Sequence, residues 1–201
     1  MTTKNARSPI ALATLDPESI PQPSQIIVLY GATAELHPLV LQSLFIRAAR
    51  AERCGLIIGD NHLNGYQLAR LARANGFDPA QLFARIEFSR PFTCYQLHHC
   101  IVQLLLGQRS AWRAFYILGL LDSFYDEEIH LTSALQLLDD ILARLRVHAT
   151  QEAPVLITLA PPPRGTTRAH LITRVLRVAD AYGQPAAAMI ECCTNQPIGF
   201  W

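Results

Sequence analysis

The sequence lacks most of the features that would assign it to a class at once. Its 201 residues contain no apolar run of the ~18 residues that a membrane-spanning helix needs, and its start has no long apolar signal core. A formal charge of +1 excludes a global basic field for nucleic acid. Five cysteines form no CxxC pair, and Cys94 and His98 have helical spacing but no second ligand pair. We therefore expect a cytoplasmic protein with no membrane partner, no metal and no cofactor.

Lysine is almost absent, because the chain has sixteen arginines but only Lys4 near its start. This absence bears on "GATAELHPLV" (31–40), which lies between two apolar segments, where a phosphate-binding loop would lie. The loop pattern G-x-x-x-x-G-K-[ST] would place Gly, Lys and Ser/Thr at positions 36 to 38. The sequence has Leu36, His37 and Pro38 there. The cation that such a loop uses is therefore missing.

The other substitutions also weaken phosphate binding after Gly31. Pro38 removes one backbone N–H donor, and Leu36 has a Cβ atom where the backbone must approach the phosphates closely. Glu35 adds a negative charge, and an unperturbed His37 is mostly neutral at pH 7. The stretch is a phosphate loop by position and not by chemistry, and an ordinary strand-to-helix turn is the alternative.

Apolar periodicity predicts alternating strands and helices after a proline-containing lead-in or arm at 1–24. Strands are expected over 25–31, 55–60, 84–90, 114–122 and 154–161. Helices are expected over 38–55, with Pro38 in its first turn, 64–77, 94–107 and 132–149. This order predicts an α/β core domain over 25–201, with a mostly parallel central sheet flanked by helices. In the tail, Gly183 and Pro185 favour a C-terminal β-hairpin.

Several segments, in this order, resemble the core of the RecA/RadA recombinase ATPases. The segment "LDPESIPQPSQIIVLYG" (15–31) is similar to the approach to the family's P-loop, and "GFDPAQLFARIEFSRPFTCYQL" (76–97) resembles its G-L-D-P…R-A-F segment. The segment "FYILGLLDSF" (115–124) is similar to its Walker B strand, and "VLITLAP" (155–161) to the strand that ends Thr-Asn-Gln. The resemblance implies a RecA-like P-loop NTPase fold.

Most residues of the family's hydrolytic site are replaced. Its catalytic Glu falls near Asn61, beside Asp60, and its phosphate-sensing Gln falls on Ala160. Asp122 and Ser123 stand for the Walker B Asp-Ser, but without a phosphate cradle Asp122 has no group with which to share a metal. The resemblance therefore implies a degenerate ATPase that is not an enzyme. The predicted degenerate nucleotide site comprises Gly31, Glu35, Leu36, His37, Pro38, Asn61, Asp122, Ser123 and Ala160.

The segment "PPPRGTTRAH" (161–170) lies where the family has a mobile DNA-binding loop. Guanidinium groups bind phosphate bidentately, and hydroxyl groups add hydrogen bonds. The candidate DNA-binding residues are accordingly Arg164, Thr166, Thr167 and Arg168. The alternative is a solvated loop that carries arginines.

The resemblance implies an inactive RecA-like accessory factor in DNA recombination or repair. Its expected partners are single-stranded DNA, bound weakly, and a RecA-like protein or another copy of the chain. Two alternatives stay open: a protein-interaction scaffold without DNA binding, and an ATP-binding protein with an atypical phosphate site. A chain with 50% hydrophobic and 16% charged residues also predicts that a partner covers apolar surface.

Overall fold

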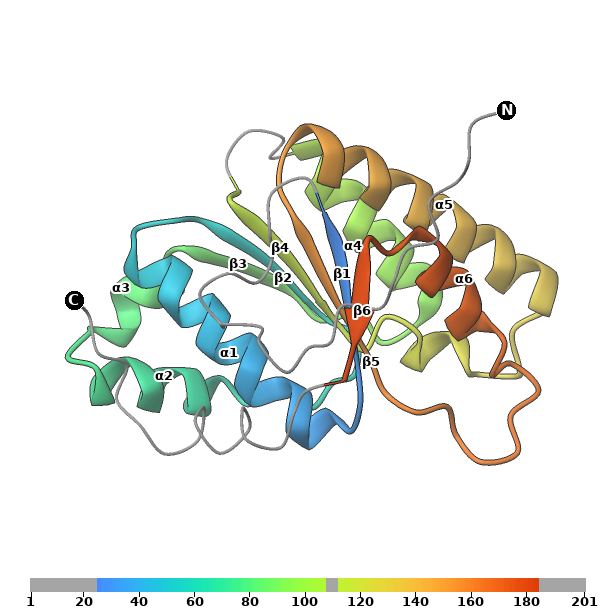
Figure 1. Ribbon diagram of the computed structural model, residues 1–201, viewed down its shortest axis with the longest axis horizontal. Helices are drawn as coiled ribbons and strands as arrows, with labels where there is room; N and C mark the ends of the chain where they lie inside the picture. Colours follow the sequence, from blue (N-terminus) through green and yellow to red (C-terminus); the bar gives the residue numbers. More distant parts are fainter. Residues whose placement is uncertain (1–24, 108–111, 185–201) are drawn as a thin grey trace.

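The computed structural model describes residues 25–107 and 112–184, which form an α/β structure around one six-stranded sheet (Figure 1). The elements in chain order are β1 (Ile26–Tyr30), α1 (Thr33–Ala49), β2 (Cys54–Ile58), α2 (Gly65–Ala74), α3 (Pro79–Phe83), β3 (Ile86–Ser89), α4 (Cys94–Gly107), β4 (Ala114–Leu118), the 3-10 turn η2 (Asp122–Phe124), α5 (Leu131–Gln151), β5 (Val155–Leu159), α6 (Leu171–Val178) and β6 (Ala181–Gly183).

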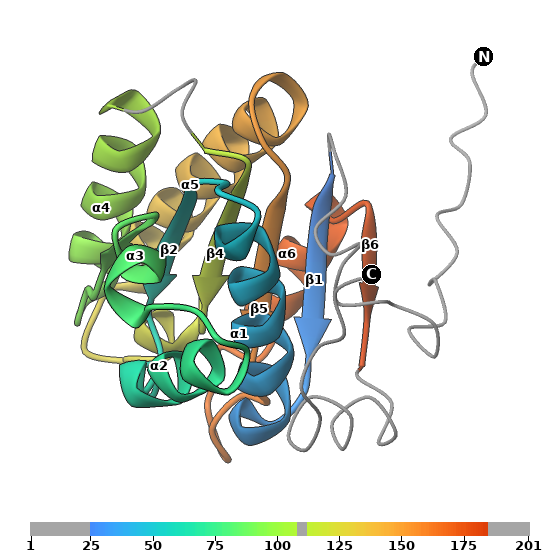
Figure 2. The ribbon, with the colours of Figure 1, turned by 90° about the vertical axis from the view of Figure 1, so that its left-hand side faces the viewer.

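All pairings in the sheet are parallel, and the strand order is β3-β2-β4-β5-β1-β6. Every residue of β2, β4 and β5 is buried, as expected for parallel strands covered on both faces. Helices α1, α2 and α3 cover one face, and α4, α5 and α6 cover the other (Figure 2). The predicted α/β class with a mostly parallel, helix-flanked sheet is confirmed.

Each face of the sheet has its own hydrophobic core. On one face, Leu44 and Phe45 of α1 belong to the same core as Leu68 of α2. On the other face, the core includes Leu97 of α4 and Leu138 of α5. No helix within 25–107 and 112–184 is long and apolar enough to cross a lipid bilayer. Because the strands are parallel, the loops that follow β1, β2, β4 and β5 meet at one edge of the sheet.

Helix α1 begins one turn earlier than the sequence predicts. It begins at Thr33, and the carbonyl of Ala32 accepts hydrogen bonds from the N–H groups of Glu35 and Leu36. Pro38 therefore lies inside the helix and not in its first turn, so the predicted start at residue 38 is wrong. The physical reason is the core, because burial of the Leu36 side chain favours an early helix start over the preference of proline for the first turn.

Most of the segment predicted as the first strand of a C-terminal hairpin forms a helix, so this part of the prediction is wrong. Residues Leu171–Val178 form α6, and the short strand β6 then pairs in parallel with β1. Leu171 and Val175 are both buried, four residues apart, which is helical spacing that the sequence analysis did not use. The hairpin's second strand falls within 185–201, outside the described residues.

The turn after α1 gives a prediction about stability. Ala51 adopts a left-handed backbone with φ of 64°, which an exposed alanine tolerates less well than glycine. We expect Ala51→Gly to raise the free energy of unfolding by about 0.5–1 kcal/mol, measured by denaturant unfolding. Gly76→Ala is the matched reverse change, because Gly76 has φ of 74° and an added Cβ would meet nothing within 4 Å. It should lower stability by a similar amount, and a stabilised Gly76→Ala variant would contradict the explanation.

Candidate functional site

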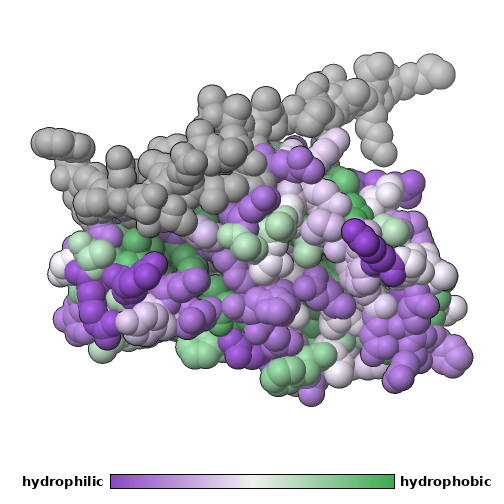
Figure 3. All heavy atoms as spheres, turned by 90° about the horizontal axis from the view of Figure 1, so that it is seen from below, coloured by the Kyte–Doolittle hydropathy of each residue, from purple (hydrophilic) through white to green (hydrophobic). Residues whose placement is uncertain are grey.

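The candidate nucleotide-site residues come from four loops at the carboxyl edge of the sheet. Gly31 follows β1, Asp60 and Asn61 follow β2, Asp122 follows β4, and Ala160 follows β5. Figure 3 views the molecule from this side, and hydrophilic side chains predominate among the described atoms, with scattered hydrophobic ones. The topology therefore brings these loops together, as the sequence analysis expected.

The segment that would hold phosphates is a helix start. Only Gly31 and Ala32 separate β1 from α1, and the Gly31 N–H donates to the carbonyl of Leu159 at 3.1 Å. The N–H groups of Glu35 and Leu36 donate to the Ala32 carbonyl at 2.9 and 3.1 Å, within the helix. In this geometry the N–H groups of Gly31, Glu35 and Leu36 are bound within the protein and are not arranged around a phosphate.

A buried histidine–carboxylate pair lies behind this helix start. The Nε2 atom of His37 is 2.6 Å from Oδ2 of Asp60, and both residues are buried. The second oxygen of Asp60 accepts the backbone N–H of His62 at 3.1 Å. Burial raises the pKa of Asp60, but the hydrogen bonds from His37 and His62 outweigh burial and leave the pKa below its usual value. The carboxylate is therefore kept in its ionised form by hydrogen bonds from within the protein.

Asp60 and Asn61, the two residues near the position of the family's catalytic Glu, differ in burial. Asn61, expected near the catalytic base position, is exposed and has a positive φ of 57°. Asp60, one residue earlier, points into the protein and pairs with His37. Asn tolerates the left-handed conformation well, so the tight turn after β2 places Asn outside and Asp inside. The sequence did contain a signal for the inward position of Asp60, because this residue follows closely after an apolar strand.

Asp122 lies close to this pair and has no hydrogen bond to it. Burial raises the pKa of Asp122 to about 6, and the negative charge of Asp60 adds to the rise. Gly119 allows this close approach. It has φ of 60°, and an added Cβ would come within 2.5 Å of the Asp60 Cβ and 3.0 Å of the Asp122 Oδ2. Ser123, next in the chain, and Ala160 are partly buried.

An open hollow of about 420 Å³ lies beside the pair, at the N-terminus of α1. Its lining residues are Thr33, Ala34, His37, Pro38, His62 and Gln67. No arginine is among them, so the hollow lacks the fixed cations that a triphosphate requires. Asp122 does not line it either, which separates the Walker B-like carboxylate from the accessible space.

Metal binding has no support in the described ranges, where no three His, Cys, Asp or Glu side chains are grouped to hold an ion. Of the two residues with helical ligand spacing, Cys94 is buried in the core and His98 lies 2.6 Å from Asp140.

The candidate DNA-binding loop is partly tied down. Arg164 is exposed, but Arg168 is only 4% exposed. The Arg168 guanidinium donates to three backbone carbonyls, those of Phe124, Asp126 and Ile129. The expectation that Arg168 presents its charge to a phosphate is therefore wrong for this arrangement, because three acceptors within the fold already bind it.

The two threonines of this loop also contact the protein. The Thr166 and Thr167 hydroxyls each donate to the carboxylate of Glu127 at 3.1 Å, and the Thr167 N–H does so at 2.8 Å. These hydrogen bonds lower the pKa of Glu127. The loop thus packs against the segment that follows β4, and of its four candidate residues Arg164 alone keeps an exposed cation.

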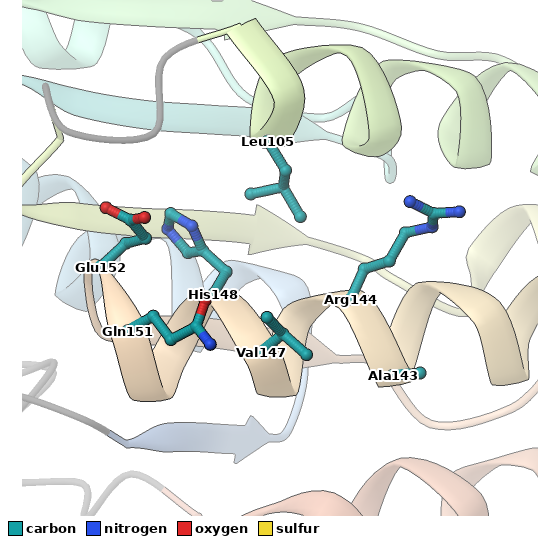
Figure 4. A pocket seen from close by; sticks show the side chains of 7 residues that line it. All are labelled: Leu105, Ala143, Arg144, Val147, His148, Gln151 and Glu152. Carbon is teal, nitrogen blue, oxygen red and sulfur yellow. The ribbon is translucent and has the colours of Figure 1, made fainter.

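A second hollow, of about 320 Å³, lies between α4 and α5 (Figure 4). Its lining residues are Leu105, Ala143, Arg144, Val147, His148, Gln151 and Glu152. The buried His148 ring contacts the rings of Trp112 and Phe115, with centroids 6.4 and 5.8 Å away. Burial lowers the pKa of His148 to about 4, so the ring is neutral at pH 7. Its surroundings indicate an aromatic packing role.

No family model matches the chain, and no curated protein is similar enough to count as a relative. The functional argument therefore rests on the residues and their geometry.

The two carboxylates predict opposite pH effects on stability. Asp122 has a raised pKa, so above pH 6 the folded protein carries an unfavourable partly buried charge that protonation relieves between pH 6 and 4. Asp122→Asn should raise the free energy of unfolding at pH 8 by about 1–2 kcal/mol, less than the full shift implies because the group is partly exposed. This gain should vanish by pH 4.

Asp60→Asn is the matched comparison. The pKa of Asp60 is lowered in the folded protein, so its contribution is present above the pKa of the unfolded chain and is lost as pH falls through the folded value. The variant should lose about 2–4 kcal/mol at pH 8, with a smaller loss in acid. Denaturant unfolding across a pH series measures both variants, and parallel pH profiles for the two would contradict the assignment.

Proposed function

We propose that this chain is a RecA-like protein that does not hydrolyse ATP and that acts by binding, as an accessory factor in DNA recombination or repair. The observation that carries the proposal is the replacement of the phosphate cradle by the first turns of α1 and the His37–Asp60 pair. The resemblance of the segments around β1, β3, β4 and β5 to the RecA/RadA core supports the choice of family. The parallel sheet, with Asp122 after β4 and Asp60 after the neighbouring β2, agrees with it.

The 161–170 loop is poorly suited to bind DNA. Arg168 is bound to backbone carbonyls, and the Thr166 and Thr167 hydroxyls bind Glu127. One exposed arginine, Arg164, gives a small footprint for a phosphate backbone. The binding role is therefore assigned to another surface.

The edge strand β3 provides that surface. Among the described strands β3 pairs with β2 alone, so one side of its backbone has no ladder partner there. Phe88 in β3, and Phe92 and Tyr95 just beyond it, are 61%, 69% and 53% exposed. An unpaired strand edge flanked by exposed aromatic side chains is typical of a site where an extended segment adds a strand.

We propose that the occupant is an extended segment of a RecA-like chain, either another copy or a relative. In the RecA/RadA family a segment before the core docks on the next subunit, and residues 1–24 occupy the corresponding place in this sequence. Backbone hydrogen bonds to β3 would give affinity, and the aromatic side chains would give specificity.

The proposal predicts that the protein releases no phosphate from ATP and Mg²⁺, with or without single-stranded DNA. The physical reason is that neither a ring of N–H donors nor a fixed cation surrounds the hollow at α1. A phosphate-release assay on the purified full chain measures this, with Asp122→Ala as the control for contaminating activity. Turnover that Asp122→Ala abolishes would contradict the proposal, and an increase in melting temperature with ATP would favour the ATP-binding alternative.

A second prediction concerns the β3 edge. Phe88→Asp should abolish association of the full chain with itself or with a purified RecA recombinase, because a buried carboxylate opposes docking. Tyr66→Asp is the matched control, since Tyr66 is 66% exposed but lies at the start of α2. Both variants should keep the wild-type melting temperature within a few degrees, because exposed positions tolerate substitution.

Light scattering and analytical ultracentrifugation measure the association. A version that lacks residues 1–20 should also lose self-association if the arm is the occupant. Equal loss in Phe88→Asp and Tyr66→Asp would place the interface elsewhere, and a monomeric wild type that binds no RecA-like protein would refute the docking proposal.

A further inference from the structure

The hollow between α4 and α5 has a buried histidine in its wall. His148 lines this space, projects from α5 toward α4 in Figure 4, and is only 4% exposed. Within the part of the chain that the structure describes, neither Nδ1 nor Nε2 of this ring has a hydrogen-bond partner. A neutral imidazole carries one N–H donor and one acceptor nitrogen, so two hydrogen bonds are missing.

Aromatic packing explains where the ring lies but not why it is a histidine. The His148 ring meets the rings of Trp112 and Phe115 edge-on, with interplanar angles of 70° and 67°. A phenyl ring could make the same contacts without placing two nitrogens where nothing binds them. Buried polar atoms normally have hydrogen-bond partners, because an unpaired one destabilises the fold. The histidine therefore points to a partner that is not part of the chain.

The size and the walls of the hollow suit a small molecule with an apolar body. Leu105 of α4 and Ala143 and Val147 of α5 supply apolar lining, and Val147 is 53% exposed. The volume of about 320 Å³ lies at the lower end of the range of ligand sites, roughly 300–1,000 Å³. An apolar cavity of about 150 Å³ can hold benzene, so this hollow has room for about two fused rings.

The charged side chains of the lining favour a ligand without net charge. Arg144 and Glu152, of opposite charge, lie at opposite ends of the hollow (Figure 4). The Nε atom of Arg144 also donates to Oδ2 of Asp140 at 2.7 Å, so a carboxylate of the protein already accompanies this cation. Burial lowers the pKa of His148 to about 4, and the ring adds no charge at pH 7. The described lining therefore has no excess charge to hold an ion.

We propose that this hollow binds an uncharged, mostly apolar alcohol or phenol, whose hydroxyl group forms a hydrogen bond with a ring nitrogen of His148. A hydroxyl both donates and accepts, so it satisfies either tautomer of the imidazole. Both nitrogens are buried, so a neighbouring side chain turns aside as the ligand enters. Glu152 is best placed to do so, because it is exposed and lies beside the ring (Figure 4). This inference does not rest on the β3 docking proposal, since the two surfaces share no residue.

A comparison of 2-naphthol with naphthalene, which lacks the hydroxyl group, tests the hydrogen bond in the full chain. Nuclear magnetic resonance titrations measure both affinities, and the imidazole ¹⁵N resonances of His148 should shift with 2-naphthol. His148→Phe keeps a ring in place and removes both nitrogens. It should lower the ratio of the 2-naphthol affinity to the naphthalene affinity by about three- to tenfold, as the loss of one neutral hydrogen bond predicts. The variant should also melt at a higher temperature than the ligand-free wild type, because it buries no unpaired nitrogen at this position.

A second pair of variants tests the location. Ala143→Phe places a ring in the hollow and should weaken 2-naphthol binding at least about tenfold, because it occupies the apolar space that the ligand needs. Gln136→Phe is the matched control, since Gln136 is exposed on the same helix and does not line the hollow. Both variants should keep the wild-type melting temperature within a few degrees, because both positions are exposed.

Three results would overturn the proposal: equal losses in Ala143→Phe and Gln136→Phe, an unchanged affinity ratio in His148→Phe, or no binding of 2-naphthol to the wild type up to its solubility limit. The last result would assign the nitrogens of His148 to enclosed water. Phe88→Asp should leave 2-naphthol binding unchanged, so failure here and failure of the docking proposal are distinguishable.

Discussion

The register of the buried parallel strands is the constraint on which the rest of the structure depends. Because β2, β4, β5 and β1 are paired in one direction with almost no solvent contact, a shift of any strand would move apolar side chains between the two faces. The register therefore fixes which loops meet. It brings Asp60 and Asp122 together at the carboxyl edge and places Arg53 beside Arg113 at the amino edge.

The two edges differ in how their charges are satisfied. At the carboxyl edge three of the polar side chains are bound within the fold, since His37 pairs with Asp60 and Arg168 donates to backbone carbonyls. At the amino edge, Arg53 and Arg113 lie next to each other and keep much of their charge exposed to water. The exposed charge of these two arginines therefore lies at the edge opposite to the predicted nucleotide site.

The sequence predicts the central strands well and the site geometry less well. Apolar runs identify β1, β2, β4 and β5 because these strands are buried on both faces, and helix α4 has the predicted bounds. The start of α1 depends on tertiary packing, which overrides the preference of Pro38 for the first helical turn. Helix α6 was missed because the helical spacing of Leu171 and Val175 was not used. The short helix α3, begun by Asp78 and Pro79, is too brief for periodicity to reveal.

Site residues were predicted by position along the chain, and side-chain direction decided the outcome. Asn61 and Asp60 are neighbours in sequence, but the turn after β2 sends only Asp60 inward. Arg168 matches a DNA-loop pattern, but two of the carbonyls that bind its side chain belong to the segment after β4, more than forty residues away in the sequence. Arg53 and Arg113 are sixty residues apart and share no motif, so only the strand register reveals their proximity.

Gly119 sets a limit on how this protein can diverge. Because glycine has no side chain, the backbones at the ends of β4 and β2 can come close together. A Cβ atom at position 119 would lie only 2.8 Å from the Asp60 N. Position 119 and the pair formed by His37 and Asp60 are therefore coupled sterically, because a side chain at 119 would displace the Asp60 backbone. A homologous chain with any larger residue at 119 would have to widen the spacing between these strand ends. Homologues that keep this arrangement of the strand ends should therefore have glycine at position 119 together with the His37–Asp60 pair.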